Sequence, residues 1–424
     1  MSRRPERLLI RGGRPLRGDV TVSGSKNAAL YAVAAGLMTA DAVTLHNVPA
    51  IADIDEMGEL LRALGARFEY VDGTAQIQAS ELTETSAPAD LVLALRASFL
   101  VMGPLLGRLG EAACASPGGD VIGARPLDVH LAGFRALGAE VGRRGAEWVA
   151  RAARLQGARI FFDYPSVLGT VNILFAAALA HGESVLINAA AEPEVEMVAN
   201  MLNSMGARIR GHGGSVVYVE GVERLHGTEF SVIPDRLEAG TYLLASAATG
   251  GDVRITNGVP HHLDSLTTKL SEMGMTVDLA PAGESGGIRA ACQGGGLRAV
   301  QAQAVPYPGF PTDLHAPLAA ALTQAHGVSV VHERVYDNRT LYVGELRKLG
   351  ARITVGGQSV IIEGGTPLVG AAVRALDIRA GAACVIAALA ADGETQVHDT
   401  NHLDRGYAHL VERLTALGAD VERA

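Results

Sequence analysis

The sequence predicts an α/β protein that consists of six copies of one unit, arranged as two domains of three. This prediction rests on a recurrent helix–glycine–strand motif, on the composition and on the length. Aromatic residues make up only 4% of the 424 residues, against 48% hydrophobic residues, so Ala, Val, Leu and Ile must fill the cores, as they do where helices pack on sheets. At roughly 100–200 residues per domain, the length allows two to four domains.

The recurrent motif is the end of an apolar helix, then a glycine, then the start of a strand. It reads LRALGARFE, FRALGAEVG, LNSMGARIR, LSEMGMTVD, LRKLGARIT and LTALGADVE, with glycines at Gly65, Gly138, Gly206, Gly274, Gly350 and Gly418. These glycines lie 68 to 76 residues apart, a regularity that argues against chance. The leucine and methionine spacing marks the buried face of a helix, which the glycine ends in a left-handed cap. The alternating residues that follow predict a half-buried strand.

A second recurrent element is an alanine-rich helix followed by a strand. It reads AAGLMTADAVTLHNV, AAALAHGESVLINAA, ASAATGGDVRITNGV, AALTQAHGVSVVHER and AALAADGETQVHDTN, and more loosely GPLLGRLGEAACASPGGD in the second copy. Each copy thus combines strands with two helices in about 70 residues, which is longer than the roughly 20–50 residues of a typical repeat. Six such copies suggest two domains of three rather than a solenoid.

Composition and charge argue against several classes of protein. The net charge of −9 disfavours a general nucleic-acid binder, which needs a basic face. The three cysteines, Cys114, Cys292 and Cys384, are widely spaced, so neither a disulfide framework nor a zinc site is predicted. The sequence has no metal-ligand spacing and no dinucleotide fingerprint, and we expect neither a metal nor a cofactor. No apolar stretch approaches ~18 residues and no secretory signal is recognisable, which predicts a cytoplasmic protein without a membrane span.

The first candidate site is the segment Val22–Leu30, which reads VSGSKNAAL. A strand ends there, Gly24 permits a tight turn, and Asn27 precedes an apolar helix that we expect to begin near Ala28. A helix N-terminus offers free N–H groups and Lys26 adds a positive charge, which together make an anion site. An ordinary helix cap beside a solvated lysine would give the same pattern, but only three of the 36 basic residues are lysines, which favours a function.

Two further segments place a carboxylate where it could act in catalysis. Pro117–His130 begins with Pro-Gly-Gly, which predicts a mobile loop over residues 117–123. It carries Asp120 near Arg125, and an acid beside a cation can protonate an anionic substrate, although such pairs on glycine-rich loops are often plain surface. In PGFPTDL, Asp313 lies just before an apolar helix, where it is either the helix N-cap or a catalytic group.

The last copies of the repeat carry three arginines after their strands, namely Arg339, Arg379 and Arg405. Asp377 and Asp404 lie beside the second and third of them. Surface ion pairs are the default interpretation. Alternatively, loops of several copies converge, and the arginines bind a carboxylate or phosphate in a common pocket.

Several motifs together resemble one enzyme family. In order along the chain they read KNAAL, PGGDVIGARP, EPE, PDRLEAGT, FPTD, DNR and DRGY. This succession is similar to that of the UDP-N-acetylglucosamine 1-carboxyvinyltransferases, the enolpyruvyl transferases that open peptidoglycan synthesis, and it extends from about Leu8 to the end of the chain. The resemblance implies two similar domains of three units each, with helices inside, sheets outside and the active site between the domains. It also implies a discontinuous domain of residues 1–25 and 234–424, and an inserted domain of residues 26–233 that carries loop 117–123.

The resemblance implies transfer of enolpyruvate from phosphoenolpyruvate to the 3-hydroxyl of UDP-N-acetylglucosamine, with release of phosphate and without a metal or cofactor. It assigns no oligomeric state. Asp120 would be the loop acid, and Asp313 would accept the proton of the 3-hydroxyl. Lys26 and Asn27 are implied to contact phosphoenolpyruvate, and Arg125 and Arg405 are implied to hold its phosphate and carboxylate, with Lys26 and Arg405 among the catalytic groups. The residues implied to line the same basic cleft are Arg96, Arg339 and Arg379. Those implied to contact the nucleotide sugar are Pro126, Leu127, Asp128, Val129 and His130 at the uracil, Ser166 and Val167 at the diphosphate, and Val335 at the sugar.

Two alternatives stay open at this point. The shikimate-phosphate enolpyruvyl transferases share the fold, but they should carry Ser and Arg groups near the first lysine, where this chain has KNAAL. A non-catalytic protein that binds a UDP-sugar is the other alternative. It is supported only by Leu168, which stands where the family commonly has glycine beside the diphosphate.

A first prediction follows from Asp120. The family usually has cysteine at this position, and the epoxide fosfomycin inactivates the enzymes by alkylating that cysteine. Because a carboxylate is a much weaker nucleophile, we expect the wild-type protein to keep its activity during incubation with fosfomycin, and Asp120→Cys to lose activity with time. Time-dependent inactivation of the wild-type protein would show that Asp120 is not the loop acid.

Overall fold

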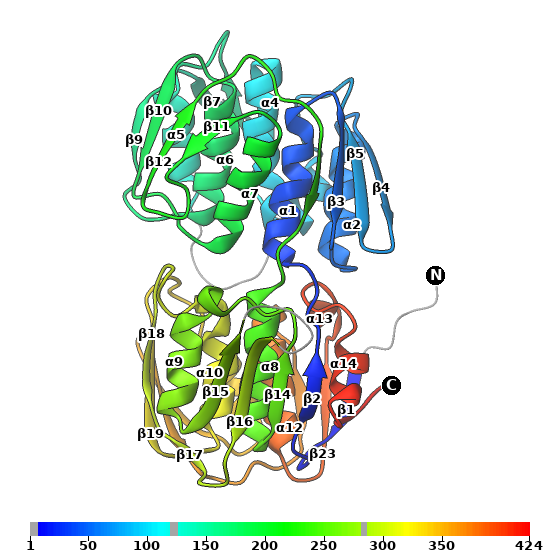
Figure 1. The fold of residues 1–424 in the computed structure, drawn as a ribbon, viewed down its shortest axis with the longest axis vertical. Helices are drawn as coiled ribbons and strands as arrows, with labels where there is room; N and C mark the ends of the chain where they lie inside the picture. The colour runs from blue at the N-terminus through cyan, green and yellow to red at the C-terminus, as the bar shows by residue number, and fades with distance from the viewer. Residues whose placement is uncertain (1–6, 119–125, 281–285) are drawn as a thin grey trace. The chain divides into compact units, whose positions relative to one another are not determined.

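The computed structural model describes residues 7–118, 126–280 and 286–424. In this part of the chain, residues 7–23 and 234–424 form one compact unit, called here the discontinuous unit, and residues 24–233 form a second, the continuous unit (Figure 1). The chain passes between them after Ser23 and after Ile233. We retain the division into domains 1–25 with 234–424 and 26–233 as a proposal about which segments fold independently.

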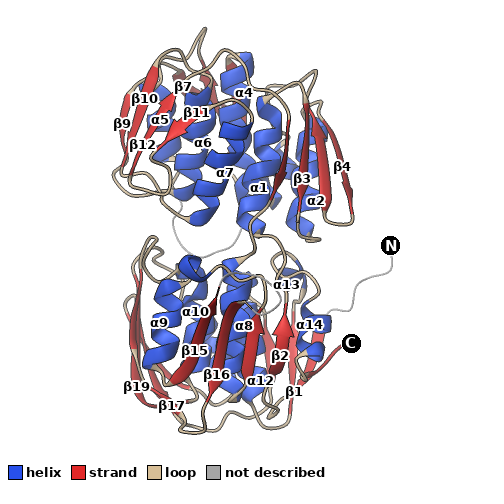
Figure 2. Ribbon diagram, in the orientation of Figure 1, coloured by secondary structure: helices blue, strands red, loops and turns tan. Residues whose placement is uncertain are grey.

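In the continuous unit, helices occupy the interior and sheets the outside (Figure 2). The central helices α1 (Lys26–Ala35) and α6 (Val167–Ala178) are apolar on nearly all sides and almost entirely buried, as a helix surrounded by protein must be. Helix α4 (Met102–Leu109) packs beside α6. The other helices are η1 (Gly36–Met38), α2 (Ala52–Ala63), α3 (Ala89–Ala94), η2 (Arg96–Val101), α5 (Asp128–Ala136) and α7 (Pro193–Ser204).

The discontinuous unit repeats this arrangement around α8 (Arg236–Thr249), α10 (His315–Leu322) and α12 (Ile378–Ala390). These three helices pack on one another and bury nearly every residue. The outer helices are η3 (Pro260–His262), α9 (Asp264–Glu272), η4 (Thr312–Leu314), α11 (Tyr342–Lys348), α13 (Asn401–Asp404) and α14 (Leu410–Ala416). The predicted fold class, with helices inside and sheets outside in both halves, is therefore confirmed.

The sheets of both units follow one plan. An edge strand pairs in parallel with a second strand, which continues antiparallel into a third and a fourth. The sheets of the continuous unit contain β13 (Thr228–Ser231), β3 (Ala42–His46), β5 (Thr74–Gln78) and β4 (Arg67–Val71); β9 (Arg159–Phe161), β10 (Glu183–Ile187), β12 (Val216–Glu220) and β11 (Arg208–Arg210); and β6 (Glu111–Ala115), β8 (Glu147–Arg151) and β7 (Glu140–Arg144). In the described residues the last of these has three strands, and it belongs to the second copy, whose sequence motif is also the loosest.

In the discontinuous unit, strands from the start of the chain complete sheets of the later copies. Strand β1 (Arg7–Arg11) pairs antiparallel with both β23 (Glu394–His398) and β24 (Asp420–Arg423). Its sheet therefore has the same order as the others only because β1 supplies the third strand. The remaining strands are β22 (Ala372–Arg374) in this sheet; β2 (Arg17–Val20), β14 (Asp252–Ile255), β16 (Gly287–Cys292) and β15 (Met275–Ala280) in the second; and β17 (Leu297–Arg298), β18 (Gln301–Ala304), β19 (Ala325–Glu333), β21 (Ser359–Gly364) and β20 (Arg352–Gly356) in the third.

The six glycines of the repeat all adopt the backbone conformation that the sequence predicts. Their φ angles lie between 90° and 102°, a region that residues with a Cβ rarely enter. Each glycine follows a helix and precedes the outermost strand of its sheet, namely β4, β7, β11, β15, β20 or β24. At this motif every copy thus turns from a helix into the outermost strand of its sheet.

No helix in the described ranges is long and apolar enough to cross a membrane.

A second prediction tests the backbone conformation of these glycines. A Cβ added at Gly138 would meet no atom within 4 Å, but the φ angle is +90°. Gly138→Ala should therefore destabilise the protein by about 1–2 kcal/mol through backbone strain alone. Gly142→Ala is the matched control, since Gly142 is also open to a Cβ, lies four residues away in β7 and has no positive φ. Urea unfolding measures both, and equal stability of the two variants would contradict the prediction.

Candidate active site

Asp313 lies just before α10, one of the three central helices of the discontinuous unit. Pro311 is extended, η4 follows, and Asp313 is the central residue of that single turn before α10 begins at His315. The preceding residues cap neither helix with a side chain, so Asp313 is not the N-cap that one reading of the sequence proposed. Its side chain keeps 26% of its exposure, so it can still meet a ligand.

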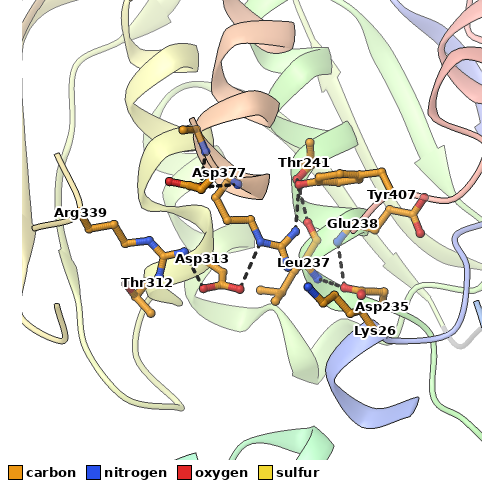
Figure 3. Close-up of polar contacts among 12 residues, drawn as sticks. Lys26, Asp235, Leu237, Glu238, Thr241, Thr312, Asp313, Arg339, Asp377 and Tyr407 are labelled. Atoms are coloured by element: carbon orange, nitrogen blue, oxygen red, sulfur yellow. Dashed lines mark hydrogen bonds and ion pairs between the residues drawn. The ribbon is translucent and has the colours of Figure 1, made fainter. Parts of the chain in front are cut away.

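Two buried arginines hold this carboxylate (Figure 3). The Oδ1 atom of Asp313 lies 2.8 Å from Nη2 of Arg339, and its Oδ2 atom lies 3.1 Å from Nε of Arg379. The exposed fractions of the two arginine side chains are only 6% and 5%. Neither arginine is therefore a member of a surface ion pair. Two of the three arginines, Arg339 and Arg379, meet at Asp313, and the common ligand pocket that includes Arg405 stays a prediction.

The guanidinium group of Arg379 is held from a second side by Tyr407. Its Nη1 donates to the phenol oxygen at 3.0 Å, and that phenol lies 2.9 Å from Oγ1 of Thr241. The Thr241 hydroxyl donates to the carbonyl of Leu237, one turn earlier in α8, so the phenol proton must point at Thr241. Asp377 does not pair with this guanidinium but caps α12, where it accepts the backbone N–H of Arg379 at 2.8 Å.

The charges of this cluster determine its protonation. Burial alone would raise the pKa of Asp313, but the nearby charges of Arg339 and Arg379 and their hydrogen bonds outweigh it and hold the pKa well below its usual value. Burial would lower the pKa of both arginines, but the negative charge of Asp313 and other groups raises both. Two arginines thus converge on one carboxylate, and guanidinium groups are the side chains that bind carboxylate or phosphate ligands bidentately.

The structure places Arg405 and Val335 in the same unit. Arg405 ends α13 and is half-buried, two residues before Tyr407. Its neighbour Asp404 pairs with Arg423, whose Nη1 lies 3.1 Å from the carboxylate. Val335 is 38% exposed and follows β19 by two residues.

In the continuous unit, Lys26 is the first residue of α1. Ser25 is the N-cap and accepts the N–H of Ala28, so the helix begins two residues earlier than the sequence suggested and Asn27 lies within its first turn. The Nζ atom of Lys26 lies 2.6 Å from Oδ2 of Asp53, and the side chains are only 10% and 1% exposed. The lysine is thus not the solvated side chain of the alternative reading, because it forms a buried ion pair.

The segment implied to cradle uracil lies beside the segment implied to approach the diphosphate. Tyr164 donates to Asp128 at 2.8 Å, and Ser166 caps α6 through the N–H of Gly169. A Cβ at Gly169 would lie 2.6 Å from Cγ1 of Val129, so α5 and α6 meet at their first turns. Pro126 is exposed, and Leu127, Val167 and Leu168 are half-buried.

His130 is buried and held as a neutral ring. Asn172 donates through Nδ2 to the carbonyl of Phe99 at 2.9 Å and to Nδ1 of His130 at 3.0 Å, which leaves the ring proton on Nε2. Burial, reinforced by the charge of Arg96, lowers the pKa of His130 to about 3. Arg96 begins η2, and its Nη1 lies 3.5 Å from the carbonyl of Pro117.

Asp120 and Arg125 lie outside the described residues, as does most of the predicted loop 117–123. Within the described ranges, no group of three or more His, Cys, Asp or Glu side chains is arranged to hold a metal ion. Sequence reasoning missed Asp53, Thr312 and Tyr407, which contact Lys26, Arg339 and Arg379. A signal existed only for the last two, since Thr312 and Tyr407 belong to the FPTD and DRGY motifs.

Comparison with known proteins gives a consistent result. Residues 10–414 match the family described as EPSP synthase (3-phosphoshikimate 1-carboxyvinyltransferase). The UDP-N-acetylglucosamine 1-carboxyvinyltransferase 1 of Halalkalibacterium halodurans is 46% identical over 99% of this chain and 94% of its own length. That of Caldanaerobacter subterraneus is 45% identical over 98% and 99%.

Solved structures share the fold. The enolpyruvyl transferase NikO from Streptomyces tendae aligns with a TM-score of 0.87 at 28% identity and covers 99% of both chains. EPSP synthase from Acinetobacter baumannii aligns with a TM-score of 0.73 at 19% identity, over 98% of this chain and all of that one, which bears on the fold alone.

A third prediction concerns the charge of Asp313. Asp313→Asn should destabilise the discontinuous unit by about 3 kcal/mol at pH 7, because two buried guanidinium groups lose their counter-ion. The difference from wild type should shrink as the pH falls below ~3.9, the unfolded value, toward the lower pKa of the folded protein, since the wild type then loses the same charge. Urea unfolding at a series of pH values measures this.

The control for this prediction is Glu272→Gln, which breaks the more exposed pair with Lys269 and should cost less than ~1 kcal/mol. A pH-independent difference between Asp313→Asn and wild type would contradict the assignment of a low pKa to Asp313.

Proposed function

This chain belongs to the UDP-N-acetylglucosamine 1-carboxyvinyltransferase family of the enolpyruvyl transferases, and on that premise we propose its reaction. The enzyme transfers enolpyruvate from phosphoenolpyruvate to the 3-hydroxyl of UDP-N-acetylglucosamine and releases phosphate, the first committed step of peptidoglycan synthesis. The observation that carries this conclusion is the 45–46% identity over nearly the whole length of two such enzymes. We place the reaction in the cytoplasm as part of the same proposal.

The acceptor is the nucleotide sugar rather than shikimate 3-phosphate. The family description that names 3-phosphoshikimate covers residues 10–414, but the solved EPSP synthase is only 19% identical. The paired first turns of α5 and α6, with a neutral buried His130 and the Ser166 cap, provide neighbouring groups for a uracil and a diphosphate. Leu168 is half-buried in the first turn of α6, and the Ser166 cap forms in its presence.

Asp313 is proposed as the group that accepts the proton of the 3-hydroxyl. In the ligand-free cluster it is a weak base, because Arg339 and Arg379 lower its pKa. An anionic substrate that binds these arginines would compete with Asp313 for their N–H groups and would weaken both contacts. The pKa of Asp313 would then rise toward its usual value, and the Asp313 carboxylate would become a stronger base when substrate is present.

The remaining groups supply charge and protons. A proton added to the methylene carbon of phosphoenolpyruvate makes C2 electrophilic, the 3-hydroxyl adds there, and the tetrahedral adduct loses phosphate and a methyl proton to restore the double bond. Asp120 is proposed as the donor of the first proton. Positive charge from Lys26, Arg405 and Arg379, with Asn27, Arg96, Arg125 and Arg339 as further contacts, is proposed to stabilise the anionic groups throughout, which is electrostatic preorganisation.

A fourth prediction tests the reaction and the role of Arg405. The wild-type protein should release phosphate from phosphoenolpyruvate with UDP-N-acetylglucosamine as the acceptor and not with shikimate 3-phosphate. Arg405→Ala should lower turnover roughly 10- to 100-fold, because a hydrogen bond to a charged group contributes about 1.5–3 kcal/mol.

The matched control is Arg208→Ala, which removes an arginine that is 64% exposed and pairs with Glu220 on the surface. It should leave turnover unchanged. Near-normal activity of Arg405→Ala would refute its assignment. A folded wild-type protein that binds the nucleotide sugar but releases no phosphate would instead support the non-catalytic alternative.

A further inference from the structure

A buried acid to which the proposed reaction assigns no role lies close to Asp313 and its two arginines. Only the side chain of Thr312 separates it from Arg339. Glu333 is the last residue of β19 and is only 1% exposed. Both of its carboxylate oxygens are engaged. Oε1 accepts the backbone N–H groups of Val335 at 2.7 Å and Tyr336 at 3.2 Å, and Oε2 accepts the hydroxyl of Thr312 at 2.7 Å.

The Thr312 hydroxyl connects this acid to Arg339. Nη1 of Arg339 lies 3.0 Å from Oγ1 of Thr312. A guanidinium group can only donate, so the hydroxyl must accept from Arg339 and must direct its single proton to Glu333. The order of donors is thus fixed from the arginine through the threonine to the acid. The other amino group of Arg339, Nη2, is the one that meets Asp313 at 2.8 Å.

We propose that Glu333 is a positioning residue, which acts through Thr312 to hold the guanidinium group of Arg339 against Asp313. The inference rests on the proposed function in so far as Asp313 is the base and Arg339 contacts substrate. Glu333 itself touches neither. The Oε1 atom of Glu333, which does not contact Thr312, holds the turn that leads from β19 to Val335. Val335 is the residue proposed to contact the sugar.

The geometry separates this role from a purely structural one. In Glu333→Gln, the remaining oxygen can still accept the backbone N–H groups of Val335 and Tyr336. The new amide group would then face Thr312 with a proton, as Arg339 already does on the other side. The Thr312 hydroxyl could accept from both, but its own proton would lose the Glu333 carboxylate as acceptor. The substitution therefore removes the charged acceptor that orients Thr312 toward Arg339, while it preserves the turn.

The experiment is a double-mutant cycle with Glu333→Gln and Thr312→Val, with Thr312→Ser as the matched control that keeps the hydroxyl. Each of the first two variants should lower kcat roughly tenfold or more, because each loses a hydrogen bond to a charged group. Thr312→Ser should stay close to wild type. In the double variant, Glu333→Gln should add no further loss to that of Thr312→Val.

Equal fold-losses from Glu333→Gln in the presence and absence of the Thr312 hydroxyl would overturn the proposal, since a turn-holding role does not depend on Thr312. A Thr312→Ser variant as slow as Thr312→Val would overturn it as well, and this comparison remains decisive if Glu333→Gln fails to fold. The same cycle measured on urea midpoints needs no turnover. Additive midpoint shifts would overturn the relay, whereas coupled shifts in a protein without phosphate release would refute the proposed function alone.

Discussion

Two buried guanidinium groups that share one carboxylate are the constraint on which the site depends. Removing Arg339 and Arg379 from water costs free energy that only a close counter-charge offsets. Asp313 supplies that charge at 2.8 and 3.1 Å. Further negative charge around the two arginines comes from Asp377, Glu333 and Asp235. The contact with Asp313 thus fixes the positions of three charged groups that come from three separate segments of the chain.

The rigid interior helices make this arrangement possible. Arg379 lies in the first turn of α12, Thr241 lies in α8, and Asp313 lies just before α10, so the buried helices place these groups together. Thr241 holds the phenol of Tyr407, which in turn contacts the guanidinium group of Arg379. Thr312 contacts the guanidinium group of Arg339. Each hydroxyl has its direction set by an acceptor, a backbone carbonyl for Thr241 and the carboxylate of Glu333 for Thr312.

The sequence predicted what depends on local rules and left open what depends on distant contacts. The repeat glycines were predictable because a helix end followed by glycine needs only its own backbone. The sequence could not decide whether Asp313 is an N-cap, because the exact start of the helix depends on the backbone, and the structure shows that Leu314 rather than Asp313 precedes α10. The partner of Lys26 was not predictable either, since Asp53 lies on another helix and belongs to no motif. The start of α1 is ambiguous in the sequence, because Ser25 and Asn27 are both favourable N-cap residues, and only the structure shows that Ser25 is the cap.

The pairing of strand β1 has a consequence for how this protein folds during its synthesis on the ribosome. Its two neighbours, β23 and β24, are separated from it by most of the chain, and at roughly 5–20 residues per second their synthesis follows about 20–80 seconds later. During that interval β1 is an unpaired edge, a feature that invites association with other chains. Residues 24–233, by contrast, contain every strand of their own sheets, so under the proposed division into domains they would fold while the rest is being made. Once residues 24–233 are folded, β2 and the segment after residue 233 lie close together. The flexible part of the chain between β1 and its partners is then shorter, and the entropy cost of bringing them together is smaller. The strand that completes the last repeat is thus the first to be synthesised and among the last to be paired.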